Sequence, residues 1–298
     1  MISICIPIYN IDVTMLIGSL SKQIRTDNLP CEIILIDDSS TEKFKQLNKA
    51  ICTKETYIEL PKNIGRSKIR NLFLNYAKLE NLLFLDCDST IIATNYLKKY
   101  IQFINEKPNY NIVFGGSVYD KKAPKRIKML RWKYGIKKES QTLEIRKQTP
   151  NKSFMTNNFL INKKIFKKIK FDERIREYGH EDTLFGYMLH QNNYSITHID
   201  NTVLNNNIED NAEYLQKTEK SINNLISILK YVNNDKELIK SVTLLNFYEK
   251  MKSRKFINII YLLFLISKPI LKHLFTKGYV NIYLFDFYKL GILIKQKK

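Results

Sequence analysis

Short apolar runs alternate with segments of helical period over roughly the first 120 residues. The runs are Ser3–Tyr9, Glu32–Ile36, Leu82–Leu85 and Ile112–Phe114. Between them, apolar residues recur every three or four positions in segments 13–22, 41–51, 67–77 and 94–104. Strands that are apolar throughout are buried on both faces, and their alternation with helices predicts an α/β fold with a mainly parallel sheet.

The pattern changes near residue 210. Leucine and isoleucine then recur at helical spacing from Leu215 to Leu229, and helical segments continue past Pro269. We therefore predict two parts, an α/β domain over 1–210 and a helical, basic extension over 211–298. The apolar run Phe256–Ile266 is shorter than the ~20 residues that span a bilayer, so we expect no integral membrane segment.

Composition excludes several classes of protein. The chain has 298 residues, 44% of them apolar and 12% aromatic, which is not typical of a disordered or low-complexity sequence. Its four cysteines form no C-x-x-C pair, and the first ten residues lack a basic segment. These features favour a reduced, cytoplasmic protein without a secretory signal.

The formal net charge of +20 is concentrated in two segments. Residues 120–147 carry +8 and residues 210–298 carry +9, whereas the remainder of the chain is nearly balanced. Concentrated positive charge favours a polyanionic partner such as nucleic acid, anionic lipid headgroups or a phosphorylated substrate. A solvated lysine-rich surface is the alternative explanation.

Acidic residues directly follow two of the predicted strands. Asp37 and Asp38 follow IILI, and the Asp-x-Asp sequence of Asp86 and Asp88 follows LLFL. Ligands of open parallel sheets bind beyond the carboxyl ends of the strands, so both pairs should line one crevice. Two such carboxylates can coordinate a hard divalent cation and hydrogen-bond a ligand, although a solvated turn has the same sequence.

Two predicted helix starts carry further candidate chemistry. The segment 63–71 (NIGRSKIRN) has Ser67 as a candidate N-cap and basic residues in its first turn, which would suit a pyrophosphate. The segment 179–182 (GHED) offers a carboxylate that could act as a general base on a hydroxyl group. His180 and His198 are candidate ligands or acceptor contacts, and either could equally be a packed or surface histidine.

Seven segments, in order and at similar spacing, resemble family 2 glycosyltransferases of the GT-A fold. They are SICIPIYN, EIILIDDSST, NIGRSKIRN, LLFLDCDS, FGGSVYD, TNNFLINKKIF and GHEDTLFGYML. The resemblance covers about residues 1–210. The closing FDFYKLGIL is similar to the end of a bacterial subgroup linked to surface polysaccharide assembly.

The resemblance implies a role for each matching residue. It places Asp37 and Asp38 at the nucleotide base and ribose, Asp86 at the ribose and Asp88 at a Mg²⁺ or Mn²⁺ ion. It makes Asp182 the general base. The other implied positions are Pro7, Tyr9, Asn63 and Arg70 for the nucleotide, Gly115, Gly116, Asn157, Asn158 and His180 for the sugar or acceptor, and Glu181 for orienting the acceptor.

One departure from the family pattern concerns the metal. Related sequences often have a histidine a few residues after the strand that contains Ile196–His198, but this chain has Leu204-Asn205-Asn206-Asn207 there. Three explanations remain open. His198 replaces the missing ligand, Asn205 is a weaker ligand, or metal binding is loosened.

The resemblance implies an inverting transferase that moves a sugar from a nucleoside diphosphate sugar, with UDP favoured, to a saccharide hydroxyl in polysaccharide or glycolipid assembly. The concentrated positive charge adds the expectation that this saccharide is lipid-linked and bears phosphate. The basic residues around 256–266 add an expectation of peripheral attachment to the inner face of the cell membrane. The alternatives are a catalytically inactive relative, a sugar-nucleotide nucleotidyltransferase and a nucleic-acid-binding protein. Segment 9–15 lacks the glycine-rich basic loop typical of nucleotidyltransferases, and no nucleic-acid recognition motif occurs.

Overall fold

The computed structural model describes residues 1–175, 178–206 and 208–298. These residues form two compact units. The first consists of 1–120, 140–176 and 185–207, and the second of 121–139, 177–184 and 208–298. The longest segment of the second unit begins close to residue 210. The unit also includes two earlier segments, 121–139 and 177–184, which were predicted to belong to the α/β domain.

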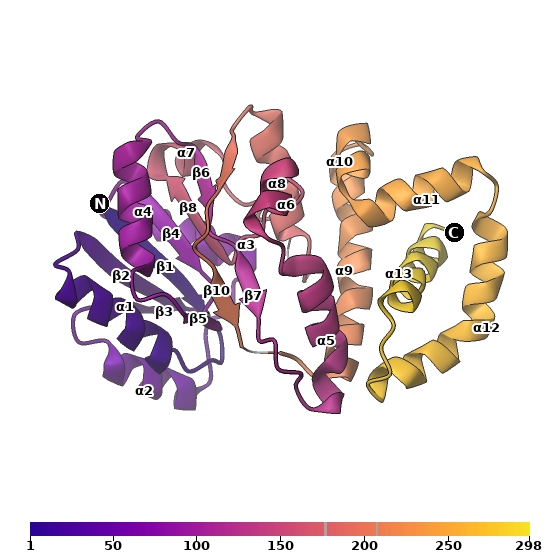
Figure 1. The fold of residues 1–298 in the computed structure, drawn as a ribbon, viewed down its shortest axis with the longest axis horizontal. Helices are drawn as coiled ribbons and strands as arrows, with labels where there is room; N and C mark the ends of the chain where they lie inside the picture. The colour runs from indigo at the N-terminus through magenta and orange to yellow at the C-terminus, as the bar shows by residue number, and fades with distance from the viewer. Residues whose placement is uncertain (176–177, 207) are drawn as a thin grey trace. The chain divides into compact units, whose positions relative to one another are not determined.

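A seven-stranded sheet forms the centre of the first unit (Figure 1), with strand order β3-β2-β1-β4-β8-β6-β9. All neighbouring strands are parallel except β8, which runs antiparallel to both β4 and β6. The prediction of a mainly parallel α/β fold is therefore confirmed. The strands are β1 (Ile2–Ile8), β2 (Cys31–Asp37), β3 (Thr56–Glu59), β4 (Asn81–Leu85), β6 (Ile112–Phe114), β8 (Asn158–Asn162) and β9 (Ile196–His198).

Helices cover both faces of this sheet, which explains why its strands are apolar throughout. One face packs against α1 (Thr14–Thr26) and α4 (Tyr96–Glu106). The other packs against α3 (Arg66–Leu72), α7 (Lys163–Lys168) and the Phe185–Gln191 part of α8 (Glu181–Gln191). The remaining helices are α2 (Glu42–Ile51) and α6 (Leu143–Gln148).

The start of α3 differs from the prediction. Gly65, rather than Ser67, occupies the N-cap position, with a φ of 84°, and Ser67 is buried inside the helix. A positive φ is costly for residues with a side chain, so glycine is suited to this turn. The helix is also short, and a 3₁₀ turn over Phe73–Asn75 follows it.

A small second sheet extends from the carboxyl edge of the first. It consists of β5 (Ser89–Ile91), β10 (Val203–Asn205) and β7 (Ser117–Tyr119), with β10 in the middle. β10 pairs antiparallel with β5 and parallel with β7. These strands were not predicted, because their sequences STI, SVY and VLN contain polar residues and form no apolar run like that of β6.

Helices make up most of the second unit. They are α5 (Met129–Tyr134), α9 (Asn211–Tyr231), α10 (Lys236–Ser241), α11 (Thr243–Ser253), α12 (Ile257–Thr276) and α13 (Ile282–Lys297). Segment 121–139 belongs here because the Leu130 backbone N–H donates to Asn211 Oδ1 at 2.8 Å and Arg131 pairs with Glu209. A short 3₁₀ turn (Arg126–Lys128) precedes α5, and a π-helical turn (Gly135–Glu139) follows it.

Helix α13 packs against α9, α11 and α12 (Figure 1). A Cβ atom at Gly291 would overlap the ring of Phe264, so glycine allows α12 and α13 to approach closely. By length and composition alone, α12 could also cross a membrane, and it is the one helix among the described residues that meets these criteria. The expectation of no integral membrane segment rested on the run that ends at Ile266, whereas α12 continues to Thr276.

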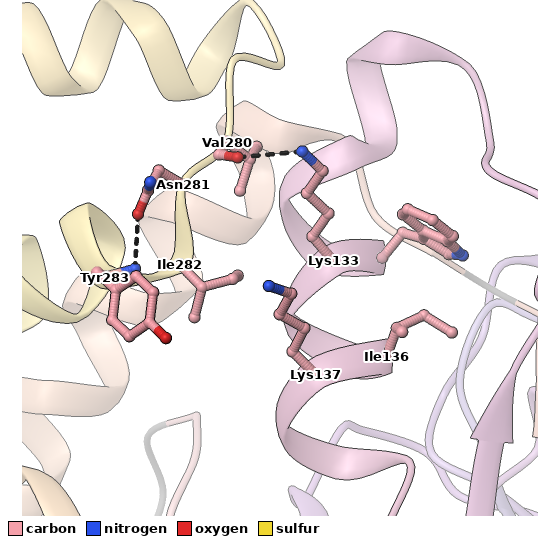
Figure 2. Close-up of a pocket in the computed structure, with 8 residues that line it drawn as sticks. Lys133, Ile136, Lys137, Val280, Asn281, Ile282 and Tyr283 are labelled. Carbon is pink, nitrogen blue, oxygen red and sulfur yellow. Dashed lines mark hydrogen bonds between the residues drawn. The ribbon is translucent and has the colours of Figure 1, made fainter.

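A cavity of about 250 Å³ lies in the second unit (Figure 2). Lys133 donates to the Val280 carbonyl at 3.1 Å, and the Tyr283 backbone N–H donates to Asn281 Oδ1 at 2.9 Å. The cavity is lined by Trp132, Lys133, Ile136, Lys137, Val280, Asn281, Ile282 and Tyr283. It combines aromatic and amine groups.

Candidate functional site

The carboxyl edge of the large sheet gathers many of the predicted site residues. β2 ends at Asp37, β4 leads into Asp86, and β6 leads into Gly115. Antiparallel β8 begins at this same edge, because Asn158 lies opposite Leu85 in the register. The Asp86 backbone N–H donates to the Asn157 carbonyl at 3.1 Å, so the start of β8 is tied to the acidic segment.

Asp37 and Asp38 are buried and hold neighbouring loops in place. Asp37 accepts hydrogen bonds from the Ser40 backbone N–H at 2.6 Å and the Tyr57 hydroxyl at 2.9 Å. Asp38 accepts from the backbone N–H groups of Ile64 and Gly65 at 2.7 and 3.1 Å. Burial raises the pKa of the Asp38 carboxyl. Their direct contact with a nucleotide stays a prediction.

Arg70 and Asp86 form an ion pair at this edge, with 2.9 Å between Nη2 and Oδ1. The Arg70 side chain is 3% exposed and lies over the Phe171 ring, whereas that of Asp86 is 28% exposed. The buried guanidinium thus holds a carboxylate that remains accessible to a ligand.

Several other predicted positions differ in their exposure. Tyr9, at the end of β1, is 51% exposed, and Asn63 is exposed beside the backbone that Asp38 holds. Asp88 and Pro7 are half-buried. The accessible groups at the carboxyl edge therefore include one aromatic ring, one amide and two carboxylates.

Asn158 is fully buried and makes four hydrogen bonds within the protein. Its Oδ1 accepts from the hydroxyls of Tyr96 and Tyr100 at 2.5 and 2.8 Å. Its Nδ2 donates to the carbonyls of Gly116 and Asn201 at 2.8 and 2.9 Å. The Asn158 side chain therefore connects α4 to the loops at the carboxyl edge, and its predicted place beside the sugar stays untested.

Asn157, by contrast, is half-buried, and its buried Oδ1 has no hydrogen-bond partner among the described residues.

Arg146 supports the glycine pair and was missed by the sequence analysis. It is 3% exposed and donates to the carbonyls of Phe114 and Ile199 at 3.4 and 3.1 Å. Gly116 has a φ of 92°, and a Cβ there would lie 2.7 Å from the Arg146 guanidinium carbon. Because Arg146 belongs to the basic segment 120–147, its sequence context does not indicate that this one cation is buried.

His198 has a partner at each ring nitrogen. Nε2 lies 2.9 Å from the Pro150 carbonyl, and Nδ1 lies 3.4 Å from Arg146 Nη1. Since Arg146 can only donate, Nδ1 accepts and Nε2 carries the proton. Burial, with a smaller effect of Arg146, lowers the pKa of His198 to about 4. We therefore do not assign His198 as a metal ligand below.

Asn205 is a better candidate than His198 for a ligand of a divalent cation. Its register partner in β5 is Ser89, the residue after Asp88. Its Nδ2 donates to the Tyr119 hydroxyl at 3.1 Å, while its buried Oδ1 lacks a hydrogen-bond partner within the described part of the chain. An amide oxygen is a suitable ligand for a hard cation, as is the Asp88 carboxylate. The described residues contain no cluster of three or more His, Cys, Asp or Glu that could hold a metal, and Asn207 lies outside them.

Three predicted residues belong to the second unit, at the start of α8. Asp182 Oδ1 accepts from the Thr183 backbone N–H at 2.7 Å, and Glu181 is buried. His180 Nδ1 lies 3.1 Å from Thr183 Oγ1, and burial lowers the pKa of His180 to about 4. A neutral His180 can exchange hydrogen bonds but carries no charge at neutral pH. The catalytic roles of these residues stay predictions.

The mainly parallel sheet, with acidic residues at its carboxyl edge, has the GT-A fold of known glycosyltransferases. Residues 1–349 of S. aureus TarS, solved in complex with UDP-GlcNAc, align over 100% of this chain and 92% of that one, with 19% identity and a TM-score of 0.55. The mannosyltransferase PcManGT from Pyrobaculum calidifontis, solved with GDP-Man and Mn²⁺, aligns over 77% of this chain and 64% of that one, with 12% identity and a TM-score of 0.54.

Sequence comparison identifies the family. Residues 3–170 match Glycosyl transferase family 2, and the chain therefore belongs to this family. An uncharacterized glycosyltransferase of Haemophilus influenzae is 35% identical over 107 residues, or 35% of this chain. Another, from Methanocaldococcus jannaschii, is 23% identical over 199 residues, or 63% of this chain. The alignments span 42% and 63% of the length of these two relatives.

We predict that Asn158→Ala destabilises the protein by about 2–5 kcal/mol, because two tyrosine hydroxyls and two carbonyls lose their buried partner. Urea unfolding followed by circular dichroism measures the change. Asn105→Ala is the matched control, since Asn105 is exposed in α4, the helix that carries both tyrosines. Equal stability of the two variants would contradict the role of Asn158 at the edge.

We also predict that His198 contributes to acid sensitivity. Its pKa is about 4 in the folded protein but about 6.5 in an unfolded chain. The unfolded state therefore binds more protons between these values, and stability falls as pH decreases from about 6.5 to 4. His198→Gln should reduce the loss of unfolding free energy between about pH 7 and 5 by about 1–2 kcal/mol. Urea unfolding at both pH values tests this, with His273→Gln as the control for an exposed histidine. An unchanged loss in His198→Gln would contradict the prediction.

Proposed function

We propose that this protein is an inverting glycosyltransferase that moves a sugar from a nucleoside diphosphate sugar to a hydroxyl group of a saccharide. The observation that carries the proposal is the accessible Asp86 carboxylate, held by buried Arg70, next to Asp88 at the carboxyl edge of the sheet. Family membership supports it independently.

The donor in this proposal binds at the carboxyl edge of the first unit. Tyr9 offers an exposed ring for a base, and Asp86 offers a carboxylate for ribose hydroxyls. A UDP-sugar is favoured, because TarS, which aligns over the whole chain, was solved with UDP and with UDP-GlcNAc. GDP-sugars are the alternative donors to test against UDP-sugars, since PcManGT was solved with GDP-Man.

A divalent cation, Mg²⁺ or Mn²⁺, is part of the proposal. The Asp88 carboxylate would hold it together with Asn205 Oδ1, which has no hydrogen-bond partner among the described residues. PcManGT was solved with Mn²⁺. When bound, such a cation supplies positive charge next to the departing diphosphate. His198 does not take part, because both of its ring nitrogens have partners.

The transfer itself needs a base for the acceptor hydroxyl, and we assign this role to Asp182. The acceptor oxygen forms a bond to the anomeric carbon while the bond from that carbon to the diphosphate oxygen breaks. The hydroxyl proton passes to the Asp182 carboxylate, and attack opposite the leaving group inverts the anomeric centre. Glu181 would orient the acceptor.

The acceptor class follows from charge. Residues 120–147 carry +8, and this excess suits a saccharide that bears phosphate, such as a lipid-linked intermediate of polysaccharide or glycolipid assembly.

Melting temperatures measured with UDP and GDP, each with and without Mn²⁺, test the donor part of the proposal. No stabilisation by either nucleotide would overturn it.

We predict that Asp88→Ala removes the Mn²⁺ dependence of nucleoside diphosphate affinity, because it removes the charged ligand. Asn205→Leu should weaken Mn²⁺-dependent binding, and Asn205→Asp should preserve or strengthen it. Calorimetric titration of UDP, with and without Mn²⁺, measures these effects. Asn206→Leu is the matched control, because Asn206 is adjacent and exposed, with its amide bonded to Thr90.

Identical Mn²⁺ dependence in wild type and Asp88→Ala would show that the cation site is elsewhere. If Asp88→Ala has the expected effect and Asn205→Leu has none, then Asn205 is not a ligand. Retained UDP binding in both cases would leave the donor assignment intact.

We predict that Asp182→Asn lowers turnover by about 10²–10⁴-fold, the usual contribution of a positioned base, while UDP affinity stays unchanged. Release of UDP from the donor sugar measures turnover, and calorimetry measures binding. Asp210→Asn is the matched control, because Asp210 is an exposed carboxylate at the N-cap of α9 and makes no side-chain capping hydrogen bond there. Turnover near that of the wild type in Asp182→Asn would move the base elsewhere, with Glu181 tested next.

A further inference from the structure

Helix α12 has two apolar faces that differ in their surroundings. Phe264, Leu271 and Phe275 are buried, and they recur at positions i, i+7 and i+11. The rings of Phe264 and Phe275 contact Tyr288 in α13, with centroids 5.7 and 5.8 Å apart. This face is therefore an ordinary helix–helix contact.

The opposite face of α12 is apolar and exposed. Its residues follow the same helical spacing on another side of the helix. We call this set the outer face: Ile259, Leu262, Leu263, Ile266 and Ile270, which are 54–65% exposed. Five large aliphatic side chains on one stripe form a contiguous patch rather than the scattered surface leucines of ordinary proteins.

The charged residues in the sequence that contains α12 are all positive. Between residues 250 and 285 the chain has no Asp or Glu and seven Lys or Arg, namely Lys250, Lys252, Arg254, Lys255, Lys268, Lys272 and Lys277. None of the seven forms an ion pair with a described residue. Their charge is thus not neutralised within the described part of the protein.

Exposed tyrosines follow the helix. Tyr279 is 57% exposed and stacks under the Arg126 guanidinium at 3.8 Å, and Tyr283 is 80% exposed. Tyr283 also lines the cavity in Figure 2, where Lys133 and Lys137 add two further amines. Aromatic rings beside an apolar surface, with cations around them, are the composition that favours a membrane–water interface.

We propose that the outer face of α12 docks onto an anionic phospholipid bilayer and lies in the plane of its headgroups. The aliphatic stripe would enter the boundary between headgroups and acyl chains, while the flanking lysines and Arg254 contact lipid phosphates. The proposal does not depend on the proposed transferase activity, since it concerns a separate surface.

Charge and packing distinguish this occupant from two others. In a symmetric contact with a second copy, the same seven cations of each chain would approach one another, which is repulsive. A membrane-spanning α12 would have to leave the contacts of Phe264 and Phe275 with α13, and would place Lys268 and Lys272 in the hydrocarbon region. An in-plane position keeps these contacts and leaves the lysines among phosphates.

Vesicle flotation with the full chain tests the proposal. The wild type should float with phosphatidylglycerol-containing vesicles at low salt, bind phosphatidylcholine vesicles far less, and dissociate as salt screens the contact. Leu262→Ser with Ile266→Ser should weaken binding more than tenfold, because two side chains lose apolar burial in the lipid. Met15→Ser with Ile145→Ser is the matched control, since both residues are exposed apolar residues of the first unit.

A second variant tests the location of the charge. Lys252→Gln, Lys255→Gln and Lys272→Gln together should weaken binding to anionic vesicles by at least tenfold, because each Lys near such a surface strengthens binding about fivefold. The matched control replaces Lys164, Lys167 and Lys168 of α7, which are also exposed, with Gln. Both triple variants lose the same net charge, so only position differs.

Four results would overturn the proposal. The first is failure of the wild type to bind anionic vesicles at low salt. The second is binding by both variants of α12 that is as strong as that of their controls. Binding that survives high salt and alkaline extraction would mean that α12 spans the bilayer. A dimeric wild type that becomes monomeric in Leu262→Ser with Ile266→Ser, measured by sedimentation, would assign the outer face to self-association.

Discussion

The carboxyl edge of the first unit depends on one constraint, which is that every polar atom of the buried Asn158 side chain is hydrogen-bonded. These bonds tie α4, through its two tyrosines, to the glycine pair after β6 and to the Asn201 carbonyl. Because a buried amide cannot give up such partners without large cost, the backbone around Gly116 has little freedom. Arg146 fills the space beside Gly116 and completes the same arrangement.

The polar groups at this edge divide by exposure. The buried ones bond to other parts of the protein, and the exposed ones are available to a ligand. Asp37, Asp38, Asn158 and Arg70 are buried and use protein partners, whereas Tyr9, Asp86 and Asp88 are at least partly exposed. Asp37 is the last residue of β2 and Asp86 directly follows β4, so one buried and one accessible carboxylate occupy nearly equivalent positions at the ends of two strands. A carboxylate in such a position is therefore either a loop anchor or a ligand contact, and exposure separates the two.

Much of the first unit could be predicted from sequence because strands at the centre of its large sheet are apolar almost throughout. Ile112–Phe114 was predicted residue by residue, and the predicted bounds of β1, β2 and β4 differ by one residue or less at each end. The strands of the small sheet escaped prediction, since their sequences STI, SVY and VLN contain polar residues and form no apolar run. The burial of Arg146 and the two partners of His198 also escaped, because both depend on residues far away in the chain.

The helical period in 256–275 predicted α12 correctly but not which side of it packs, since Leu262 and Phe264 are both apolar. Packing against α13 selects Phe264 and leaves Leu262 exposed.

The residues behind the net charge of +20 likewise include buried cations with partners and exposed cations without an ion-pair partner among the described residues. Arg70 and Arg146 are buried. Arg70 pairs with a carboxylate and Arg146 donates to carbonyls, so both guanidinium groups have partners inside the fold. The seven cations around α12 have no such partners among the described residues, and they surround an exposed apolar stripe. Their charge is therefore available to an external anion, and an extended anionic surface would meet all seven together with the stripe between them.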